Sequence, residues 1–259
     1  LLRAVATTWR SQDMPAASGT GHWFVSPTTV VTAEYGAGGV HKDVATTYSY
    51  DPASFAVLSE VDHGEVVMGD RGSFTDSGTD AITTSRLFVT GNPHLSGLVS
   101  SVTLTNQSGS KQSEVRTYYD GLPLQQAAKG SVTAEEQWIA EAVYAIRQKT
   151  YSAFGLVMTE TNPLGGVVTN VYDGNQLFPV TVTGPLGHVT TYQYDYFVGK
   201  ATRITHPNGS QEGYVYDGLG RVVAVQSSHP TTGQLATTAT FSYGQVSPSF
   251  SVTTTLYLS

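Results

Sequence analysis

The feature that most constrains this chain is an internal repeat in its C-terminal half. Three lines of 22 residues, beginning at Asn162, Gly184 and His206, align without a gap. The positions that coincide in all three are Pro163, Pro185 and Pro207, Gly165, Gly187 and Gly209, and the pairs Tyr172-Asp173, Tyr194-Asp195 and Tyr216-Asp217. A constant period indicates that one supersecondary element is used repeatedly, so we predict a repeat architecture for this region.

Each repeat has the local chemistry of a β-hairpin. In the Pro-x-Gly step, proline sets the backbone angle that a type I turn needs, and glycine closes the turn. The run from Val189 to Tyr194 alternates side chains between two faces, which is the periodicity of a strand. At the Asp-Gly corner that follows, the carboxylate can accept hydrogen bonds from nearby backbone amides. Two strands of roughly 5 to 6 residues and two turns fill one repeat. We therefore predict hairpins in which aspartate caps the turn and tyrosine packs on its neighbours, in preference to a sugar-binding ladder of Tyr-Asp pairs.

Composition supports an all-β fold for the whole chain. Charged residues make up 13% of the 259 residues, about half the usual share of roughly 25%. Thr, Ser, Gly and Tyr take their place, and Thr and Tyr favour strands while Gly favours turns.

The repeat divides the chain into two regions. Residues 116–259 are predicted to be a hairpin array with a 22-residue period. Residues 1–115 are predicted to be an irregular β region with degenerate repeats. The pairs Tyr50-Asp51 and Tyr119-Asp120 have the sequence of the same corner at irregular spacing. After the third repeat the spacing lengthens to 27 residues, from Tyr216 to Tyr243, and we place the insertion in residues 228–233.

Residues 133–147 permit two interpretations. Thr133 and Glu136 have the spacing of a helix capping box, and the apolar residues from Trp138 to Ile146 fall on one helical face. The surrounding β pattern favours a long hairpin instead, and we favour the hairpin.

The third repeat resembles a known family. The run from Tyr216 to Val222, Tyr-Asp-Gly-Leu-Gly-Arg-Val, resembles the Rhs/YD repeat, in which Tyr-Asp is followed after two residues by Gly-Arg and an apolar strand. The segment from Tyr118 through Trp138 is similar to the YD-repeat region of the B components of insecticidal toxin complexes. The other two repeats lack Gly-Arg at the matching place. The resemblance is clearest from about residue 115 to 245 and implies repeated β-hairpins that form a curved or spiralling strip of sheet, coiled into a hollow shell.

The function that the resemblance implies is structural. In that family the shell sequesters a toxic polypeptide until delivery, so the expected partners are the remaining shell, of the same or a companion polypeptide, and an enclosed toxin cargo. The expected location is secreted or at the cell surface. Some members cleave themselves at an aspartate-proline-glycine-leucine motif, but here Asp51-Pro52 is followed by Ala53-Ser54. The alternative is an adhesion module of the cell surface or wall that binds carbohydrate or another cell.

Other chemistry has little support in the sequence, and we expect no enzyme. The net charge is −7 and the 13 Lys and Arg residues are scattered, whereas a nucleic-acid surface needs clustered cations. Cysteine is absent, and the seven histidines lack metal-ligand spacing; most adjoin Gly or Pro, so we expect solvated turn residues and no cofactor. The carboxylate pairs Asp76/Asp80 and Glu135/Glu136 fit polar loops. No apolar run reaches the roughly 18 residues of a membrane helix.

The sequence at both ends of the chain is typical of strands that lie inside a sheet. Leu1 begins a mostly apolar run, and residues 250–258 alternate like a strand that has a neighbour on each side. We expect the terminal strands to pair with further polypeptide, and the chain expressed alone to aggregate or to protect its terminal amides poorly.

Overall fold

The computed structural model describes residues 2–14, 22–35, 41–52, 54–229, 232–246 and 249–257. Leu1 and Leu258, on which part of the expectation for the chain ends depends, lie outside these ranges, as do Ala53, Pro230 and Thr231. The chain divides into two compact units, Leu1–Arg147 (unit 1) and Gln148–Ser259 (unit 2). This division reflects contacts, whereas our boundary after residue 115 separates irregular from repeated sequence.

The described part of unit 1 is a meander of antiparallel strands with one short 3-10 turn. Strands that follow one another in the chain pair with each other, except that β4 pairs with both β5 and β6. The elements are β1 (Leu2–Met14), β2 (His22–Tyr35), β3 (His41–Tyr50), β4 (Val57–Met68), η2 (Asp70–Gly72), β5 (Phe74–Asp76), β6 (Ile82–Phe88), β7 (Val99–Asn106), β8 (Lys111–Tyr119) and β9 (Val132–Ala140).

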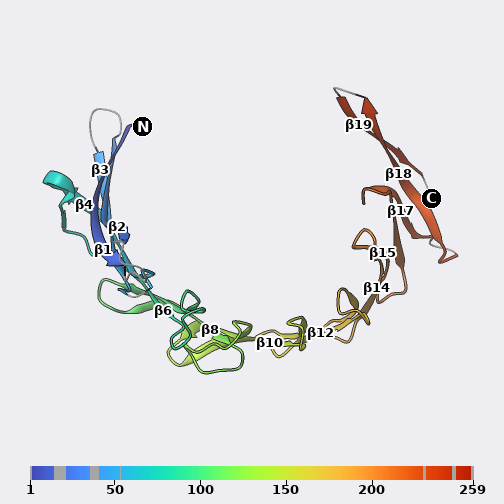
Figure 1. The fold of residues 1–259 in the computed structure, drawn as a ribbon, viewed down its shortest axis with the longest axis horizontal. Helices are drawn as coiled ribbons and strands as arrows, with labels where there is room; N and C mark the ends of the chain where they lie inside the picture. The colour runs from blue at the N-terminus through green and yellow to red at the C-terminus, as the bar shows by residue number, and fades with distance from the viewer. Residues whose placement is uncertain are drawn as a thin grey trace. The chain divides into compact units, whose positions relative to one another are not determined.

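Unit 2 is a second antiparallel meander, made mostly of shorter strands. Figure 1 shows its hairpins following one another in chain order, from β12 to β19. The strands are β11 (Val157–Thr161), β12 (Val167–Tyr172), β13 (Pro179–Thr183), β14 (Val189–Asp195), β15 (Lys200–Thr205), β16 (Gln211–Tyr216), β17 (Val222–Ser228), β18 (Leu235–Val246) and β19 (Ser249–Leu256). Strand β10 (Val143–Tyr151) contains the boundary between the units. The predicted all-β fold of repeated hairpins is confirmed.

The buried apolar core lies in unit 1. Val31, Ala45 and Val66, from β2, β3 and β4, form one cluster against which Met68 and Phe74 pack. In the described part of unit 2 only Asp173, Gly213 and Ala239 are buried. A thin sheet of short hairpins shields few side chains from water on both faces, so unit 2 depends more on its turns and ladders.

Residues 133–147 belong to a pair of strands and form no helix. Strand β9 ends at Ala140, β10 begins at Val143, and Ala142 takes a positive φ of 57° between them. Thr133 caps no helix; its hydroxyl donates to the carbonyl of Tyr118 and accepts from the N–H of Gly121. Ile139 and Ile146 are exposed, so the apolar face of the alternative helix has no counterpart.

The insertion after the third repeat lies in a loop. Strand β17 ends at Ser228 and β18 begins at Leu235. The N–H of His229 donates to the carbonyl of Gln234 over 2.8 Å, which closes the described part of this loop. The insertion therefore falls between β17 and β18, which pair with a register shift between Val225 and Gln226.

Candidate functional site

The Tyr-Asp corners occupy equivalent places in three successive hairpins. Tyr172 is the last residue of β12, Tyr194 the penultimate residue of β14, and Tyr216 the last residue of β16. In each strand the register shifts immediately before the tyrosine. Such a bulge kinks the strand locally, and here it marks the point where pairing ends and the corner begins.

The aspartates of these corners bond to their own turns. Asp217 Oδ1 accepts from the amides of Leu219 and Arg221, both at 2.9 Å, and Oδ2 accepts from Arg221 Nε at 2.7 Å. The amide and side chain of Arg221 lower the pKa of Asp217 below its usual value. The Gly-Arg of the third repeat therefore completes the corner: glycine takes a φ of 73° at Gly220 and arginine pairs with the aspartate.

The other two corners vary this arrangement. Asp173 Oδ1 accepts from the amides of Leu177 and Phe178, and Oδ2 accepts from the hydroxyl of Tyr196 in the next corner. That hydroxyl lowers the pKa of Asp173. Asp195 Oδ1 accepts from the amide of Phe197 over 2.7 Å. The hydroxyl of Tyr196 thus takes the place of the missing arginine at Asp173, whereas the amide of Phe197 matches that of Leu219 in the third corner.

The tyrosines of the corners tie adjacent strands together through their hydroxyls. Tyr172 donates to the carbonyl of Val157 over 3.1 Å, and Tyr216 to the carbonyl of Ala201 over 2.8 Å. Tyr243 donates in the same way to Val222. In each case the acceptor lies at or near the start of the preceding strand. Tyr194 instead stacks on Phe178, with ring centroids 4.5 Å apart.

The same bond recurs at the irregular corners of unit 1. Tyr50 donates to the carbonyl of Pro27 and Tyr119 to that of Val99, both over 2.8 Å. The predicted packing of the tyrosine ring leaves out this role of the hydroxyl. The constant position of tyrosine at or next to the end of the first strand of each repeat was the available signal. Because the hydroxyls of Tyr172 and Tyr216 and the carboxylates of Asp173 and Asp217 have local partners, these corners favour a structural role over a sugar-binding one.

The Pro-x-Gly turns close the opposite ends of the hairpins. The N–H groups of Gly165, Gly187 and Gly209 each donate over 2.9 Å to the carbonyl three residues earlier, and all three glycines have a positive φ. Asn162 Oδ1 also accepts from the amides of Leu164 and Gly166. These are the bonds of a type I turn followed by a left-handed residue, which suits a hairpin.

Asp120 forms the most extensive corner. Its Oδ2 accepts from the amides of Ala128, Lys129 and Gly130, each at 2.8 Å, and its Oδ1 from Ser131 at 3.0 Å. Burial alone would raise the pKa of Asp120, but the four amide donors outweigh it and lower the pKa to about 2. The carboxylate thereby organises the loop between β8 and β9.

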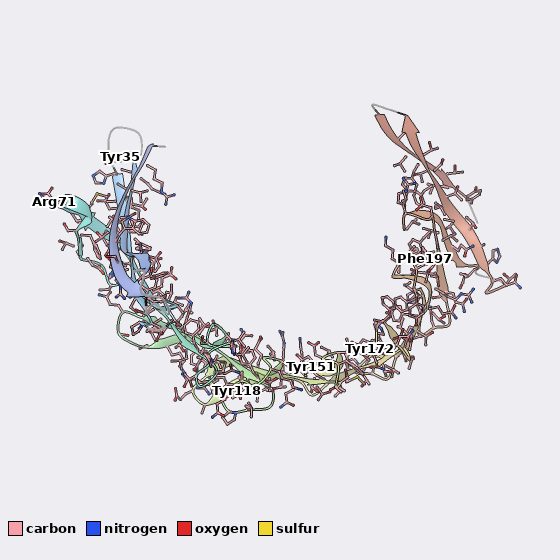
Figure 2. All side chains as sticks on the ribbon, viewed as in Figure 1. Tyr35, Arg71, Tyr118, Tyr151, Tyr172 and Phe197 are labelled. Atoms are coloured by element: carbon pink, nitrogen blue, oxygen red, sulfur yellow. The ribbon has the colours of Figure 1, made fainter. Side chains whose placement is uncertain are left out.

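A charged network surrounds Glu114 in β8, and it was not predicted from the sequence. Glu114 is buried and accepts from Lys111 Nζ at 2.5 Å, Arg116 Nε at 3.0 Å and the Tyr144 hydroxyl at 2.7 Å. Burial would raise its pKa, but these donors together lower it to about 2. Arg116 also pairs with Glu136, which accepts from the hydroxyl of Tyr118. Figure 2 labels Tyr118. Of the pair Glu135/Glu136, which we expected to be solvated, Glu136 is therefore bonded to side chains of the sheet.

One histidine is placed differently from our expectation. His63 lies in β4 and is largely buried; Nδ1 is 3.0 Å from Asp76 Oδ2, and Nε2 is 3.0 Å from Thr47 Oγ1. It is therefore no solvated turn residue, because its ring packs on Phe74 and both nitrogens have partners. The order hydroxyl, imidazole, carboxylate is that of an acyl-transfer triad. Thr47, however, is paired on both sides in the ladder, which favours a structural tie.

A cavity of about 620 Å³ in unit 1 has the size of a small-ligand site. Its polar lining is mostly engaged: Asp51 bonds to Ser54, and Arg86 Nη2 bonds to Glu60 at 3.2 Å. Among the described residues that line it, Arg86 has a buried side-chain nitrogen, Nη1, without a hydrogen-bond partner; the other such atom in the described ranges, Ser26 Oγ, is not part of the lining. This pattern favours a gap between packed loops over a ligand site.

Within the described ranges, no group of three or more potential metal ligands occurs. None of the helical segments that the structure describes has the length and apolarity needed to cross a membrane.

The fold is similar to parts of solved toxin-complex structures. No family model and no curated protein matches the sequence. The crystal structure of TcdB2-TccC3-Cdc42 matches with a TM-score of 0.72 and 11% identity over 93% of this chain. TcdB2-TccC3-TEV matches with a TM-score of 0.68 and 13% identity over 91% of this chain. The Photorhabdus luminescens Tc holotoxin pore, with a mutant TccC3, matches with 0.68 and 13% over 93%. The chain spans only 16–17% of the length of these structures. It therefore has the fold of a segment of the TcdB2-TccC3 proteins.

Proposed function

We propose that this chain is a structural segment of an Rhs/YD-type shell that encloses a toxic polypeptide for delivery. The observation that carries the proposal is the match of 91–93% of the chain to TcdB2-TccC3 structures, together with a 22-residue hairpin repeat of YD type. In this proposal the segment performs no catalysis. Its partners are the remaining shell and the cargo, and the assembled protein is secreted.

The chemistry of the corners supports a scaffold role. The carboxylates of Asp173 and Asp217 and the hydroxyls of Tyr172 and Tyr216 bond within or between neighbouring hairpins. A hairpin whose polar groups are hydrogen-bonded locally can be repeated many times, because its stability depends only on its neighbouring hairpins. This is the property that a long wall of sheet requires.

The proposal is tested by protection of the cargo. The gene that encodes this segment is expressed with all of its downstream sequence, and the product is treated with a non-specific protease. We expect the downstream polypeptide to survive in the native product and to be digested after the shell is opened with denaturant. The same polypeptide expressed alone serves as the control. Digestion at equal rates in the native product and alone would contradict an enclosing role.

The alternative function is adhesion, and a binding assay distinguishes it from enclosure of a cargo. Binding of the purified product to glycans or to whole cells, without protection of any downstream polypeptide, would support an adhesion module instead. Hydrolysis of a glycan or peptide that is abolished by Asp217→Ala, at an unchanged melting temperature, would contradict the proposal that the corners are structural.

A further inference from the structure

Two of the six asparagines in this chain have the sequence of a glycosylation acceptor, an amide to which a sugar is attached. Residues 106–108 (Asn-Gln-Ser) and 208–210 (Asn-Gly-Ser) match the motif Asn-x-Ser, in which x is not proline. Each motif lies in a hairpin turn, the first between β7 and β8 and the second between β15 and β16. So short a motif occurs by chance in many chains, and the structure around it decides whether an enzyme can use it.

Both turns are open to solvent. Ser108 and Asn208 are exposed, and Asn106 is half-buried. A Cβ atom added at Gly109 or Gly209, beside the two motifs, would meet no heavy atom within 4 Å apart from its chain neighbours. An enzyme that modifies these asparagines has to surround the turn, and the rest of the described chain leaves room for it.

The serine of each motif bonds to its own asparagine. Ser108 Oγ donates to Asn106 Oδ1 over 2.7 Å, and Ser210 Oγ donates to Asn208 Oδ1 over 2.7 Å. The two asparagines hold different places, because Asn106 is the first residue of its turn and Asn208 is the third. The same side-chain contact is therefore made in both motifs from two different backbone positions.

These contacts occupy the oxygen of each side-chain amide and leave its nitrogen free. Each Oδ1 also accepts from a backbone N–H, that of Ser110 at Asn106 and that of Ser210 at Asn208. In the described ranges neither Nδ2 has a hydrogen-bond partner, whereas Asn170 Nδ2 donates to a backbone carbonyl over 3.0 Å. When Nδ2 loses a proton, negative charge develops on Oδ1, and the two donors stabilise that charge. Both amides are therefore prepared to act as nucleophiles through nitrogen.

We propose that Asn106 and Asn208 are acceptors for enzymatic N-glycosylation. The donor is a sugar carried on a diphosphate that is linked to a nucleotide or to a lipid, and a transferase supplies the base. Nδ2 attacks the anomeric carbon of the sugar, and the bond from that carbon to the diphosphate breaks with its electron pair on the diphosphate. The proton of Nδ2 passes to the base. Each turn then carries a bulky, polar group beyond the strand ends.

Modification of the folded protein tests the proposal. The folded product of the whole gene is incubated with a soluble asparagine glycosyltransferase and UDP-glucose, and its peptides are analysed by mass spectrometry. Synthetic peptides of residues 100–112 and 202–214 serve as unfolded references. We expect hexose on Asn106 and Asn208 of the folded protein as well as on the peptides. Modification of the peptides alone would overturn the proposal, and so would unmodified asparagines at both positions in protein from the natural host.

Variants of the first motif test the serine hydroxyl. Ser108→Ala should lose the modification at Asn106 and keep it at Asn208, with an unchanged melting temperature. Ser108→Thr retains a hydroxyl and should restore the modification at Asn106. Modification that persists in Ser108→Ala would overturn the role of the hydroxyl, and with it the proposal.

A third turn offers a gain of modification. Asn162 is also the first residue of its turn, and its Oδ1 also accepts from the backbone N–H four residues later. Pro163 and Leu164 follow it, so the motif is absent. Pro163→Gln combined with Leu164→Ser copies the sequence at Asn106 and should create a third modified asparagine. An unmodified Asn162 in this double variant would overturn the proposal. None of these assays involves a cargo, so this proposal and the enclosing role can fail separately.

Discussion

Unit 1 and unit 2 are both antiparallel meanders, but different interactions hold them together. Unit 1 has an apolar cluster around Val31 and buried charged groups such as Glu114. Unit 2 repeats a small corner in which Asp217 bonds to residues two and four positions later in the chain. The first depends on contacts between distant residues, and the second on contacts within one turn or between neighbouring hairpins.

The difference shows how a sheet strip can be built in two ways. In unit 1 the hydroxyl of Tyr144 reaches Glu114 across 30 residues of chain. A residue that makes such a contact joins several strands, so its loss should lower the stability of all of them. In unit 2 each hairpin depends mainly on its neighbours, and a local change should remain local.

Glu114→Gln should have the largest effect. A neutral amide at the buried Glu114 removes the carboxylate that Lys111 and Arg116 share, and loss of a buried ion-pair partner typically costs about 3 kcal/mol. We expect a loss of that order in the free energy of unfolding of unit 1, measured by urea denaturation. Glu65→Gln, which removes a surface partner of Lys42 at 3.5 Å in the same unit, is the control and should cost roughly 0–1 kcal/mol. Equal effects would show that the network is dispensable.

Asp120→Asn should cause the next largest loss in the free energy of unfolding, and this loss should depend on pH. Four amides donate to the carboxylate, and its pKa is lowered to about 2 from 3.8. A lowered pKa gives stability that is present above about pH 4 and is lost as the pH falls towards 2, worth about 2 kcal/mol. The variant should therefore be less stable than the natural chain at neutral pH, and the gap should narrow in acid. Urea denaturation across this pH range measures it. A gap that is constant with pH would contradict a role for the charge.

The sequence predicts unit 2 better than unit 1, for a physical reason. The period of 22 residues and the Asp-Gly and Pro-x-Gly steps encode turns through residues that are adjacent in the chain. The network of Glu114, Arg116 and Tyr144 has no local signature, because chain folding alone brings its members together. His63 shows the same limit: its neighbour Gly64 indicated a turn, whereas distant Asp76 and Thr47 hold it in a strand.

Removing a tyrosine hydroxyl should cause a smaller loss of stability, and the loss can be compared between the two units. Tyr119→Phe leaves the carbonyl of Val99 unpaired beside a buried ring, so it should cost about 1 kcal/mol or somewhat more. Tyr216→Phe removes the same bond at a half-buried site where water can replace it, so it should cost less. Thermal melting of both variants compares them, with Tyr192→Phe as a ring-preserving control. A larger loss for Tyr216→Phe would reverse the contrast between the units.

The central claim is that unit 2 is stabilised hairpin by hairpin. Native-state hydrogen exchange on Asp217→Ala tests it most directly, because the variant loses one local cap worth about 1 kcal/mol. We predict that amides of β16 and β17 lose protection while those of β11 and β12 keep it. Loss of protection to the same extent in every strand of unit 2 would contradict the claim and show that unit 2 unfolds as one cooperative block.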